Sequence, residues 1–292
     1  MSAAALARGW SVTRANPALV AWTLLTMGAV LILTVAGAVA PLLTALGWDF
    51  QSDLAPLAAS RSVEAVADAV IVLEDAFDRS AVVTGTSLAL VLWTAALVLY
   101  CFAQAGLWGS LGELRRRGLE SRLEAARLVH WGKRLFAPFF WFVNLYAVVA
   151  SALLLLAVVA LALGVRGALA AQLLAACGIF AVAIALLVVH LWYGPGRAAL
   201  AWPSNGLGSS LRRGLGLLRQ RFAAVLLLAA LVALAGLLSS AVASLLSATL
   251  GRLAFAVQLV LGLLQGVVTA FLATLHAAAL VNLLRPAMET AP

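Results

Sequence analysis

The chain has 292 residues, of which 65% are hydrophobic and only 10% are charged, and its net charge is +8. A soluble domain carries about 25% charged residues, so this composition excludes an ordinary soluble globular protein. Several apolar runs exceed the ~20 residues that span a bilayer, and the basic residues gather beside these runs without the aromatic-basic platform of a nucleic-acid binder. We therefore expect an all-α polytopic membrane protein that binds no nucleic acid.

Six apolar segments follow one another along the chain. The predicted spans cover residues 18–40, 82–108, 138–163, 169–193, 223–246 and 255–284. Residues 1–16 form a short amphipathic lead, and Pro17 suits the first turn of the helix that follows. Pro41 and Trp48 mark the exit of the first span at the membrane interface. This first run is long enough to remain as a span, so we expect no cleaved signal.

Residues 49–80 form the one acidic region, with seven acidic side chains against Arg61 and Arg79. Five of its apolar residues share one helical face; they are Val63, Val66, Val70, Leu73 and Phe77. The segment is too short and too acidic to span a membrane. It is predicted to be an amphipathic helix on the outer side, packed on protein.

Two basic segments, at residues 109–135 and 194–222, are predicted to be cytoplasmic arms. The first contains the run Arg115, Arg116 and Arg117. Its sequence Ser121-Arg122-Leu123-Glu124 fits a capping box, which predicts the start of a helix.

The second arm begins at Gly194-Pro195-Gly196, which predicts the end of the fourth span, and Ser209 or Ser210 could cap a new helix. On this new helix Leu211, Leu215, Leu218 and Phe222 share one face. Arg212, Arg213 and Arg219 lie away from this stripe, and Arg197 and Arg221 are the other arginines of the arm. A basic helix of this kind is typical of the membrane interface.

The distribution of Lys and Arg predicts the orientation. Fifteen of these residues fall on the side that holds both termini and the two arms, and four fall on the opposite side. Positive residues favour the cytoplasmic side, so both termini are predicted to be cytoplasmic, in a bacterial cell membrane.

A weak repeat suggests that the spans are arranged as three hairpins. Trp10 precedes Pro17 by seven residues, and Trp131 precedes Pro138 by the same spacing; each pair leads into an odd-numbered span. The third lead-in keeps the order of basic and then aromatic residues at 219–222. We interpret the chain as three hairpins, each preceded by a basic interfacial segment, with the acidic helix inserted in the first hairpin.

The second arm also carries a family resemblance. Pro203, then Ser209-Ser210-Leu211-Arg212-Arg213, then the basic-aromatic entry at 219–222 resembles a group of bacterial six-span membrane proteins. The group includes the membrane domain attached to some glycerophosphodiester phosphodiesterases. This chain lacks the catalytic domain and its acidic metal ligands, so the resemblance implies a fold and a location without the phosphodiesterase activity.

No Asp, Glu, Lys or Arg lies within a predicted span, which argues against proton-coupled or charge-paired transport. His190 and His276 each lie in the cytoplasmic half of an even-numbered span, so the two side chains could approach one another. Each is predicted to be a neutral side chain bonded to another helix rather than a metal ligand. No catalytic motif, metal-ligand spacing or cofactor motif is present, so we expect no enzymatic activity and no cofactor.

Polar amides within the spans either bond helices together or line a cavity for a polar ligand, and helix bonding is the favoured interpretation. They are Gln104, Asn144, Gln172, Gln258, Gln265 and Asn282. Small residues repeat every four positions in the last two spans, at Gly236, Ser240 and Ser244 and at Gly262, Gly266 and Ala270. They predict close packing of spans five and six, or else a contact between copies of the chain.

Three functions remain open at this point. The leading one is a non-enzymatic membrane protein that organises or assists partners, with membrane lipids and other membrane proteins as its contacts. The second is a permease-like or lipid-handling protein with a cavity between hairpins. The third, a membrane enzyme, has the least support.

Overall fold

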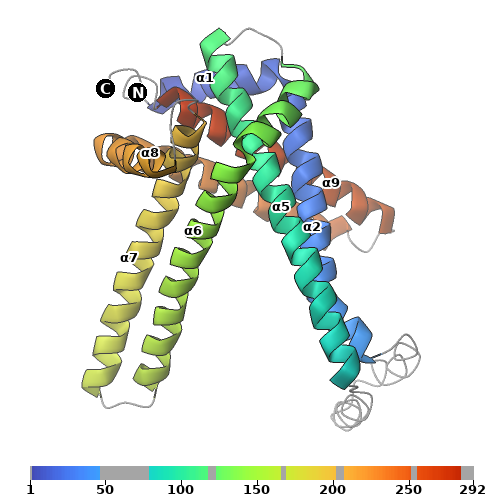
Figure 1. The fold of residues 1–292 in the computed structure, drawn as a ribbon, viewed down its shortest axis with the longest axis vertical. Coiled ribbons are helices and arrows are strands. Elements are labelled where there is room, and N and C mark those ends of the chain that lie inside the picture. Colours follow the sequence, from blue (N-terminus) through green and yellow to red (C-terminus); the bar gives the residue numbers. More distant parts are fainter. Residues whose placement is uncertain are drawn as a thin grey trace. The chain divides into compact units, whose positions relative to one another are not determined.

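The computed structural model describes residues 2–46, 79–117, 123–165, 169–201, 207–250 and 255–283. Seven helices account for almost all of this part of the chain (Figure 1). They are α1 (Ser2–Ala15), α2 (Pro17–Leu46), α5 (Arg79–Arg117), α6 (Ala125–Val165), α7 (Leu169–Leu200), α8 (Leu207–Leu250) and α9 (Phe255–Leu283). The predicted acidic helix at 49–80 lies outside the described residues, apart from its last two, and so do the capping Ser121 and Pro203.

Several helices are longer than the sequence predicted, because proline does not end them. Pro41, Pro138 and Pro195 each lie inside a helix that continues on both sides. A proline removes one backbone hydrogen bond, but leaving the helix would expose many more polar groups to lipid. The prediction that Gly194-Pro195-Gly196 ends the fourth span is therefore wrong, whereas Pro17 does open α2 as expected.

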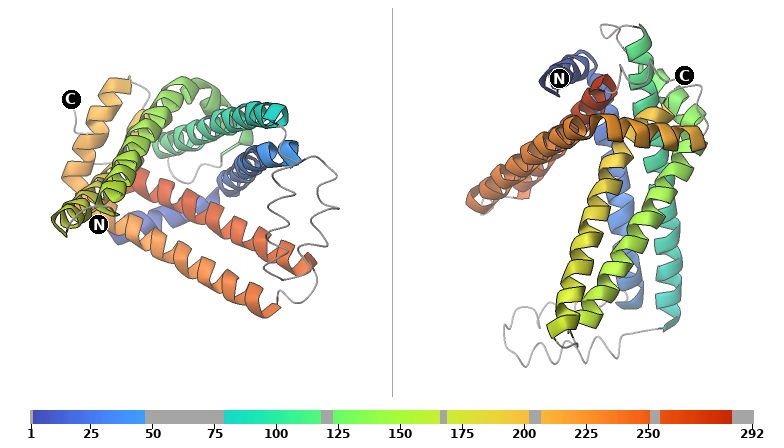
Figure 2. Two further views of the ribbon diagram at one scale, coloured as in Figure 1. Left: turned by 90° about the horizontal axis from the view of Figure 1, so that it is seen from below. Right: turned by 90° about the vertical axis from the view of Figure 1, so that its left-hand side faces the viewer.

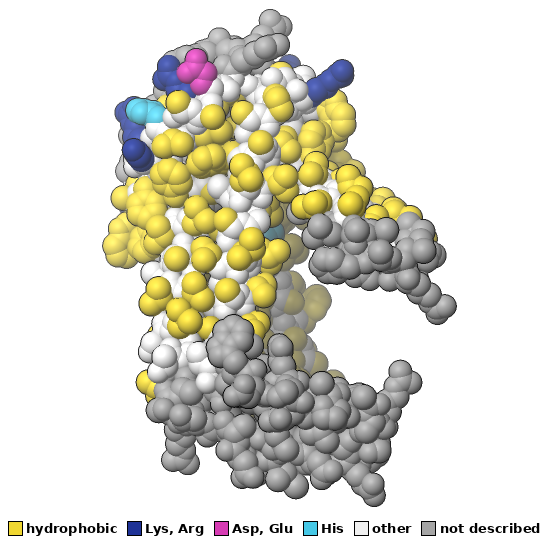
Figure 3. Space-filling view, turned by 90° about the vertical axis from the view of Figure 1, so that its right-hand side faces the viewer, with side chains coloured by type: hydrophobic (Ala, Val, Ile, Leu, Met, Phe, Trp, Pro, Cys, Tyr) yellow, Lys and Arg dark blue, Asp and Glu magenta, His cyan; other side chains and the backbone are white. Residues whose placement is uncertain are grey.

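Six of these helices are long and apolar enough to cross a membrane. The candidate spans within the described residues are Pro17–Pro41, Val83–Arg115, Ala125–Ala162, Gln172–Leu200, Leu207–Leu246 and Val260–Leu283. Every one of the six presents large apolar side chains that are more than half exposed, for example Leu31, Val91, Leu155, Leu174, Leu237 and Leu263. Figure 3 shows hydrophobic side chains along most of the visible helices, with Lys and Arg gathered toward one end. Such a surface requires a lipid environment, because monomeric soluble proteins expose only small apolar patches.

The chain divides into two compact units, and the smaller one comprises residues 26–100. Within it α2 and α5 lie in close contact. The Nε1 of Trp93 donates a hydrogen bond to the carbonyl of Thr34 at 3.2 Å. A Cβ added to Gly37 would lie 2.6 Å from the same indole nitrogen, and one added to Gly85 would lie 2.6 Å from the Cα of Pro41. Glycine at these two positions lets the helices approach closely.

The larger unit comprises residues 1–25 and 101–292. In it α6 and α7 lie antiparallel along their length (Figure 1). A Cβ on Gly164 would meet Ala175 at one end, and Tyr146 bonds His190 nearer the other. The helices α8 and α9 form a second pair (Figure 2).

The first helix, α1, packs on the last one, α9. A Cβ added to Gly9 would lie 2.8 Å from the backbone nitrogen of Ala279, and the rings of Trp10 and Phe271 meet edge to face at 5.1 Å. Where α2 begins, the hydroxyl oxygens of Thr23 and Thr274 lie 3.1 Å apart. Residues near the two ends of the chain therefore share one core.

The helix α8 contains the predicted boundary between the second arm and the fifth span. Its backbone departs from helical geometry at Arg221, with φ of −127° and ψ of 23° (Figure 2). The sequence placed the boundary between Phe222 and Ala223, within two residues of this kink. The predicted N-cap is wrong, because the helix already begins at Leu207 and Ser210 is buried within it.

Candidate functional site

One arginine, Arg197, lies near the end of α7 among side chains of two other helices. Arg197 belongs to α7 because this helix continues through Pro195 and Gly196. A Cβ on Gly196 would lie 2.4 Å from the ring of Phe142, so only glycine admits α6 at this point. A Cβ on Gly214 of α8 would lie 2.8 Å from the Cα of Gly196. Gly196, which the sequence suggested as a helix breaker, instead forms a crossing point with Gly214 that positions Arg197.

The guanidinium of Arg197 is held by a neutral amide and two aromatic faces. Its Nη1 donates a hydrogen bond to the Oε1 of Gln104 at 2.8 Å. The Nε1 of Trp108 donates to the same oxygen at 3.1 Å. The Cζ of Arg197 lies 4.9 Å from the ring centre of Trp108 and 4.2 Å from that of Tyr193. These cation–π contacts fix the guanidinium between α5 and α7.

An aromatic stack extends the same site toward the middle of α6 and α7. The ring of Tyr193 stacks on Phe142 at 5.4 Å and on Tyr146 at 4.2 Å. The hydroxyl of Tyr146 lies 3.2 Å from the Nδ1 of His190, within hydrogen-bond distance. His190 on α7 therefore contacts Tyr146 on α6, the kind of interhelical contact that the sequence predicted for it.

Two nitrogen atoms at this site are buried without a hydrogen-bond partner among the described residues. They are the Nε of Arg197 and the Nδ1 of His276 on α9. His276 precedes Leu280 by one helical turn on α9, and the side chain of Leu280 would lie 2.7 Å from a Cβ on Gly194 of α7, so His276 lies beside the part of α7 that includes His190 and Arg197. The prediction of a helix-bonding role is not met at the Nδ1 of His276. Buried polar atoms without partners are uncommon, so this pair calls for a physical explanation.

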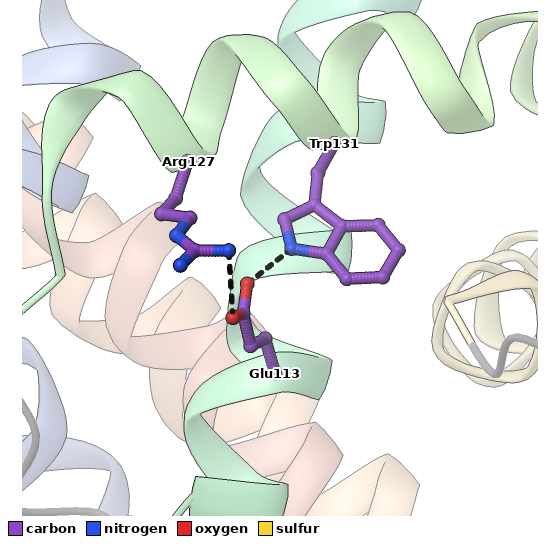
Figure 4. A network of polar contacts seen from close by, with 3 residues as sticks. All are labelled: Glu113, Arg127 and Trp131. Carbon is purple, nitrogen blue, oxygen red and sulfur yellow. Dashed lines mark hydrogen bonds and ion pairs between the residues drawn. The ribbon is translucent and has the colours of Figure 1, made fainter.

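A second polar cluster joins α5 to the beginning of α6 (Figure 4). The buried carboxylate of Glu113 accepts a hydrogen bond from the Nε1 of Trp131 at 2.5 Å, and its other oxygen lies 3.5 Å from the Nη1 of Arg127. Trp131 is also buried, whereas Arg127 is 44% exposed. The indole bond therefore contributes more than the ion pair, which water screens.

The predicted polar residues have different surroundings. Gln265 joins α8 and α9, since its Oε1 accepts from Ser239 and its Nε2 donates to Ser240, each at 3.1 Å. Gln265 therefore makes contacts between two helices, and Gln104 on α5 likewise accepts a hydrogen bond from Arg197 on α7. Asn144 instead donates to the carbonyl of Phe140 on its own helix at 2.7 Å. The side chain of Gln258 lies outside the described residues.

The predicted small-residue packing is only partly present within this chain. A Cβ on Gly262 would meet nothing within 4 Å, and one on Gly266 would meet Leu24 of α2 rather than α8. Ser244 is exposed, so Ser240 is the member of this set that contacts the neighbouring helix. At these positions α8 and α9 are joined by the amide of Gln265 and not by close backbone contact.

The predicted interfacial arginines all belong to helices. Arg115 is half-buried on α5, which also includes Arg116 and Arg117, whose side chains are not described. On α8, Arg212 and Arg219 are exposed, whereas Arg213 and Arg221 are half-buried.

Sequence reasoning missed two charged residues with specific contacts, Arg197 and Glu113. It counted Arg197 only as one charge of an arm, because the helix was expected to end before it. Glu113 stood among arginines and was not singled out. The signal for both was their neighbours, because small and apolar residues surround each of them: Gly196, Ala198 and Ala199 flank Arg197, and Gly112 and Leu114 flank Glu113.

Comparison of the chain with protein-family models, curated proteins and solved structures finds no match. Among the described residues, no group of three or more His, Cys, Asp or Glu side chains could hold a metal ion. The six apolar helices define the class of protein: the chain is a multi-pass integral membrane protein.

Proposed function

We propose that this chain is a non-enzymatic protein of the bacterial cytoplasmic membrane that organises the lipids of the inner leaflet, and with them its partner proteins. In this proposal its spans form three hairpins with both termini in the cytoplasm. The resemblance to the membrane domain attached to some glycerophosphodiester phosphodiesterases belongs to the same proposal. The observation that carries it is the surface of the first part of α8, residues 207–220, called here the arm helix.

The arm helix has a buried side and an exposed apolar side. Ser210, Leu217 and Leu218 are each at most 3% exposed and face the rest of the protein. Leu215 and, just past the kink, Phe222 are 49% and 43% exposed. Leu215 is exposed whereas Leu218 is buried, and Phe222 lies beyond the kink at Arg221, so these residues do not form the single stripe predicted from the sequence.

Two exposed arginines border this exposed apolar side. Arg212 and Arg219 are exposed, and a spacing of seven places them on one line of the helix next to Leu215. An apolar strip with flanking arginines matches the boundary between acyl chains and anionic headgroups. Each arginine near such a surface contributes about 1 kcal/mol of attraction.

A depth measurement tests the contact with lipid. Spin labels at Leu215 and Gln220, in a chain whose two cysteines are replaced, would be compared in vesicles containing phosphatidylglycerol. Both residues are outward-facing, but their directions around the helix differ by about 140°. We expect the label at 215 to be accessible to oxygen in the bilayer and the label at 220 to be accessible to an aqueous nickel complex. Equal aqueous accessibility at both positions would refute an interfacial arm helix.

The organising role itself is tested by lipid composition. The annulus around the purified protein in mixed-lipid nanodiscs should be enriched in phosphatidylglycerol. The double variant Arg212→Gln/Arg219→Gln should lose this enrichment, whereas Arg212→Lys/Arg219→Lys, which keeps the charge, should retain it. An unchanged annulus in the glutamine variant would count against the proposal.

A second candidate function, handling of individual lipids, is favoured by the contacts of Arg197. Arg197 is half-buried, its Nε is buried without a hydrogen-bond partner among the described residues, and its hydrogen bond to Gln104 goes to a neutral acceptor.

A further inference from the structure

We propose that Arg197, together with His276, forms a specific binding site for a phosphate group, supplied by a phospholipid headgroup or by a soluble phosphate. The site is separate from the arm helix and does not depend on the proposed function. It is built from α5, α7 and α9, and its ligand would be held by side chains that the described residues leave incompletely satisfied.

The positive charge of Arg197 has only neutral contacts among the described residues. Its guanidinium donates a hydrogen bond to Gln104, a neutral acceptor, and lies over the rings of Trp108 and Tyr193. Neither an amide oxygen nor an aromatic face carries a full negative charge. Guanidinium groups in apolar surroundings are normally paired with an anion, because an unpaired buried charge is costly.

The guanidinium of Arg197 has N–H donors beyond the one that bonds Gln104. A guanidinium has five N–H groups in a planar fork, and one of them is used by Gln104. The Nε is buried and has no partner among the described residues. The Nδ1 of His276, on a different helix, is in the same condition. These two nitrogens belong to helices that contact each other close by, because a Cβ on Gly194 of α7 would lie 2.7 Å from the side chain of Leu280 on α9. We infer that one phosphate oxygen supplies the acceptor for the Nε of Arg197 and, in the tautomer that carries a proton on Nδ1, for His276.

The position of Arg197 along the membrane normal suits a phosphate ligand. Arg197 follows Gln172, the first residue of the candidate span on α7, by 25 residues. At 1.5 Å per residue this is about 38 Å, which exceeds the roughly 30 Å thickness of a hydrocarbon core. Arg197 is also only three residues before Leu200, the last residue of this span, so we infer that it lies toward one membrane surface, where phosphate groups are concentrated, and away from the midplane. The rings of Trp108 and Tyr193 suit the same interfacial level.

The recognition chemistry of arginine also suits phosphate. Phosphate oxygens accept two parallel bonds from an arginine fork, which adds geometric specificity to the charge attraction. The fork of Arg197 cannot rotate freely, since Gln104 and the two rings fix its plane. A preorganised donor loses less freedom on binding than a flexible surface arginine. A lysine would keep the charge but would lose the fork and the flat contacts with both rings.

Binding is tested on the full-length protein in mild detergent by native mass spectrometry. Phosphatidylglycerol, phosphatidylcholine and inorganic phosphate would be titrated separately. We expect retention of one phosphatidylglycerol, with affinity about tenfold weaker in Arg197→Gln, as loss of a charge-assisted bond predicts. The matched control Arg8→Gln removes an exposed arginine of α1 that belongs neither to this site nor to the arm helix, and it should leave this single binding event unchanged. His276→Gln should weaken it less than Arg197→Gln.

The arms of the titration distinguish the source of the phosphate. Retention of lipid that inorganic phosphate does not displace supports a headgroup site, and binding of inorganic phosphate alone supports a site for a soluble phosphate. Equal affinity of the wild type and a folded Arg197→Gln variant for every ligand would overturn the proposal.

If Arg197→Gln fails to fold, the proposal is tested by comparing the wild type with Arg197→Lys in thermal unfolding. Phosphatidylglycerol should raise the thermal unfolding temperature of the wild type and raise that of Arg197→Lys less. No shift in the wild type with any of the three phosphate compounds would also overturn the proposal. Loss of annular enrichment in the arm variants, with this single site intact, would concern the arm helix alone.

Discussion

The crossing of α7 and α8 at two glycines makes the sharpest stability prediction. Replacing Gly214 with alanine would place a Cβ 2.8 Å from the Cα and 3.0 Å from the nitrogen of Gly196, and 3.4 Å from the carbonyl carbon of Pro195. Carbon atoms pack at about 3.5–4.0 Å, so the two backbones would have to separate by roughly 0.7 Å or more. Because all three neighbours are backbone atoms, no side-chain rotation can relieve the contact.

The same helix offers a matched control at Gly216. A Cβ at that position would meet nothing within 4 Å. Alanine in place of glycine favours a helix by about 1 kcal/mol, and this gain applies to both variants. Overpacking costs typically 1–3 kcal/mol, and this cost applies only to Gly214→Ala. We therefore expect Gly216→Ala to be more stable than the wild type and to exceed Gly214→Ala by about 1–3 kcal/mol.

Thermal unfolding in one detergent, followed by tryptophan fluorescence and by size-exclusion chromatography, would measure the difference. Displacement of α7 should also move Arg197, so Gly214→Ala should weaken the binding of phosphatidylglycerol as well. If the two alanine variants unfold at the same temperature, α7 and α8 do not cross at these glycines, and the positioning of Arg197 would need another explanation.

Two further predictions concern polar contacts. Glu113→Ala removes the carboxylate that accepts the hydrogen bond of the buried Trp131 indole, and it should lower the free energy of unfolding by about 1–3 kcal/mol. Arg127→Ala removes a screened ion pair and should lower it by at most about 1 kcal/mol. Equal losses for the two variants in thermal unfolding would contradict this prediction. Gln265→Leu removes two hydrogen bonds between α8 and α9 and should lower the free energy of unfolding by about 0.6 kcal/mol per bond. The same unfolding assay measures the loss. A loss of several kcal/mol would mean that this amide does more than join two helices.

Much of the helical layout was predictable because long apolar runs leave few alternatives in a membrane. The opening of α2 at Pro17 and the change of direction near Phe222 follow from local residues. The helix ends were less predictable. Rules learned from soluble helices assign Pro41 and Pro195 to boundaries, but in lipid the backbone keeps its internal hydrogen bonds and the helices continue through both.

The candidate site was less accessible from the sequence than the fold. Its members come from α5, α7 and α9, and nothing in the order of residues states that Gln104 meets Arg197, which is 93 positions away. The histidines could be singled out because ionisable residues in apolar segments are rare, and their approach could be expected from their depth. The role of Arg197 could not, because its importance depends on the continuation of α7.

The contact between Thr23 and Thr274 has a consequence for biosynthesis. These residues lie 251 positions apart, and at 5–20 residues per second the ribosome needs about 13–50 s between them. During this interval α1 and the first turns of α2 exist without α9, on which they finally pack. A chain that stops before the last helix would therefore leave its own beginning uncovered, and a protease that inspects nascent membrane proteins could recognise the incomplete product there.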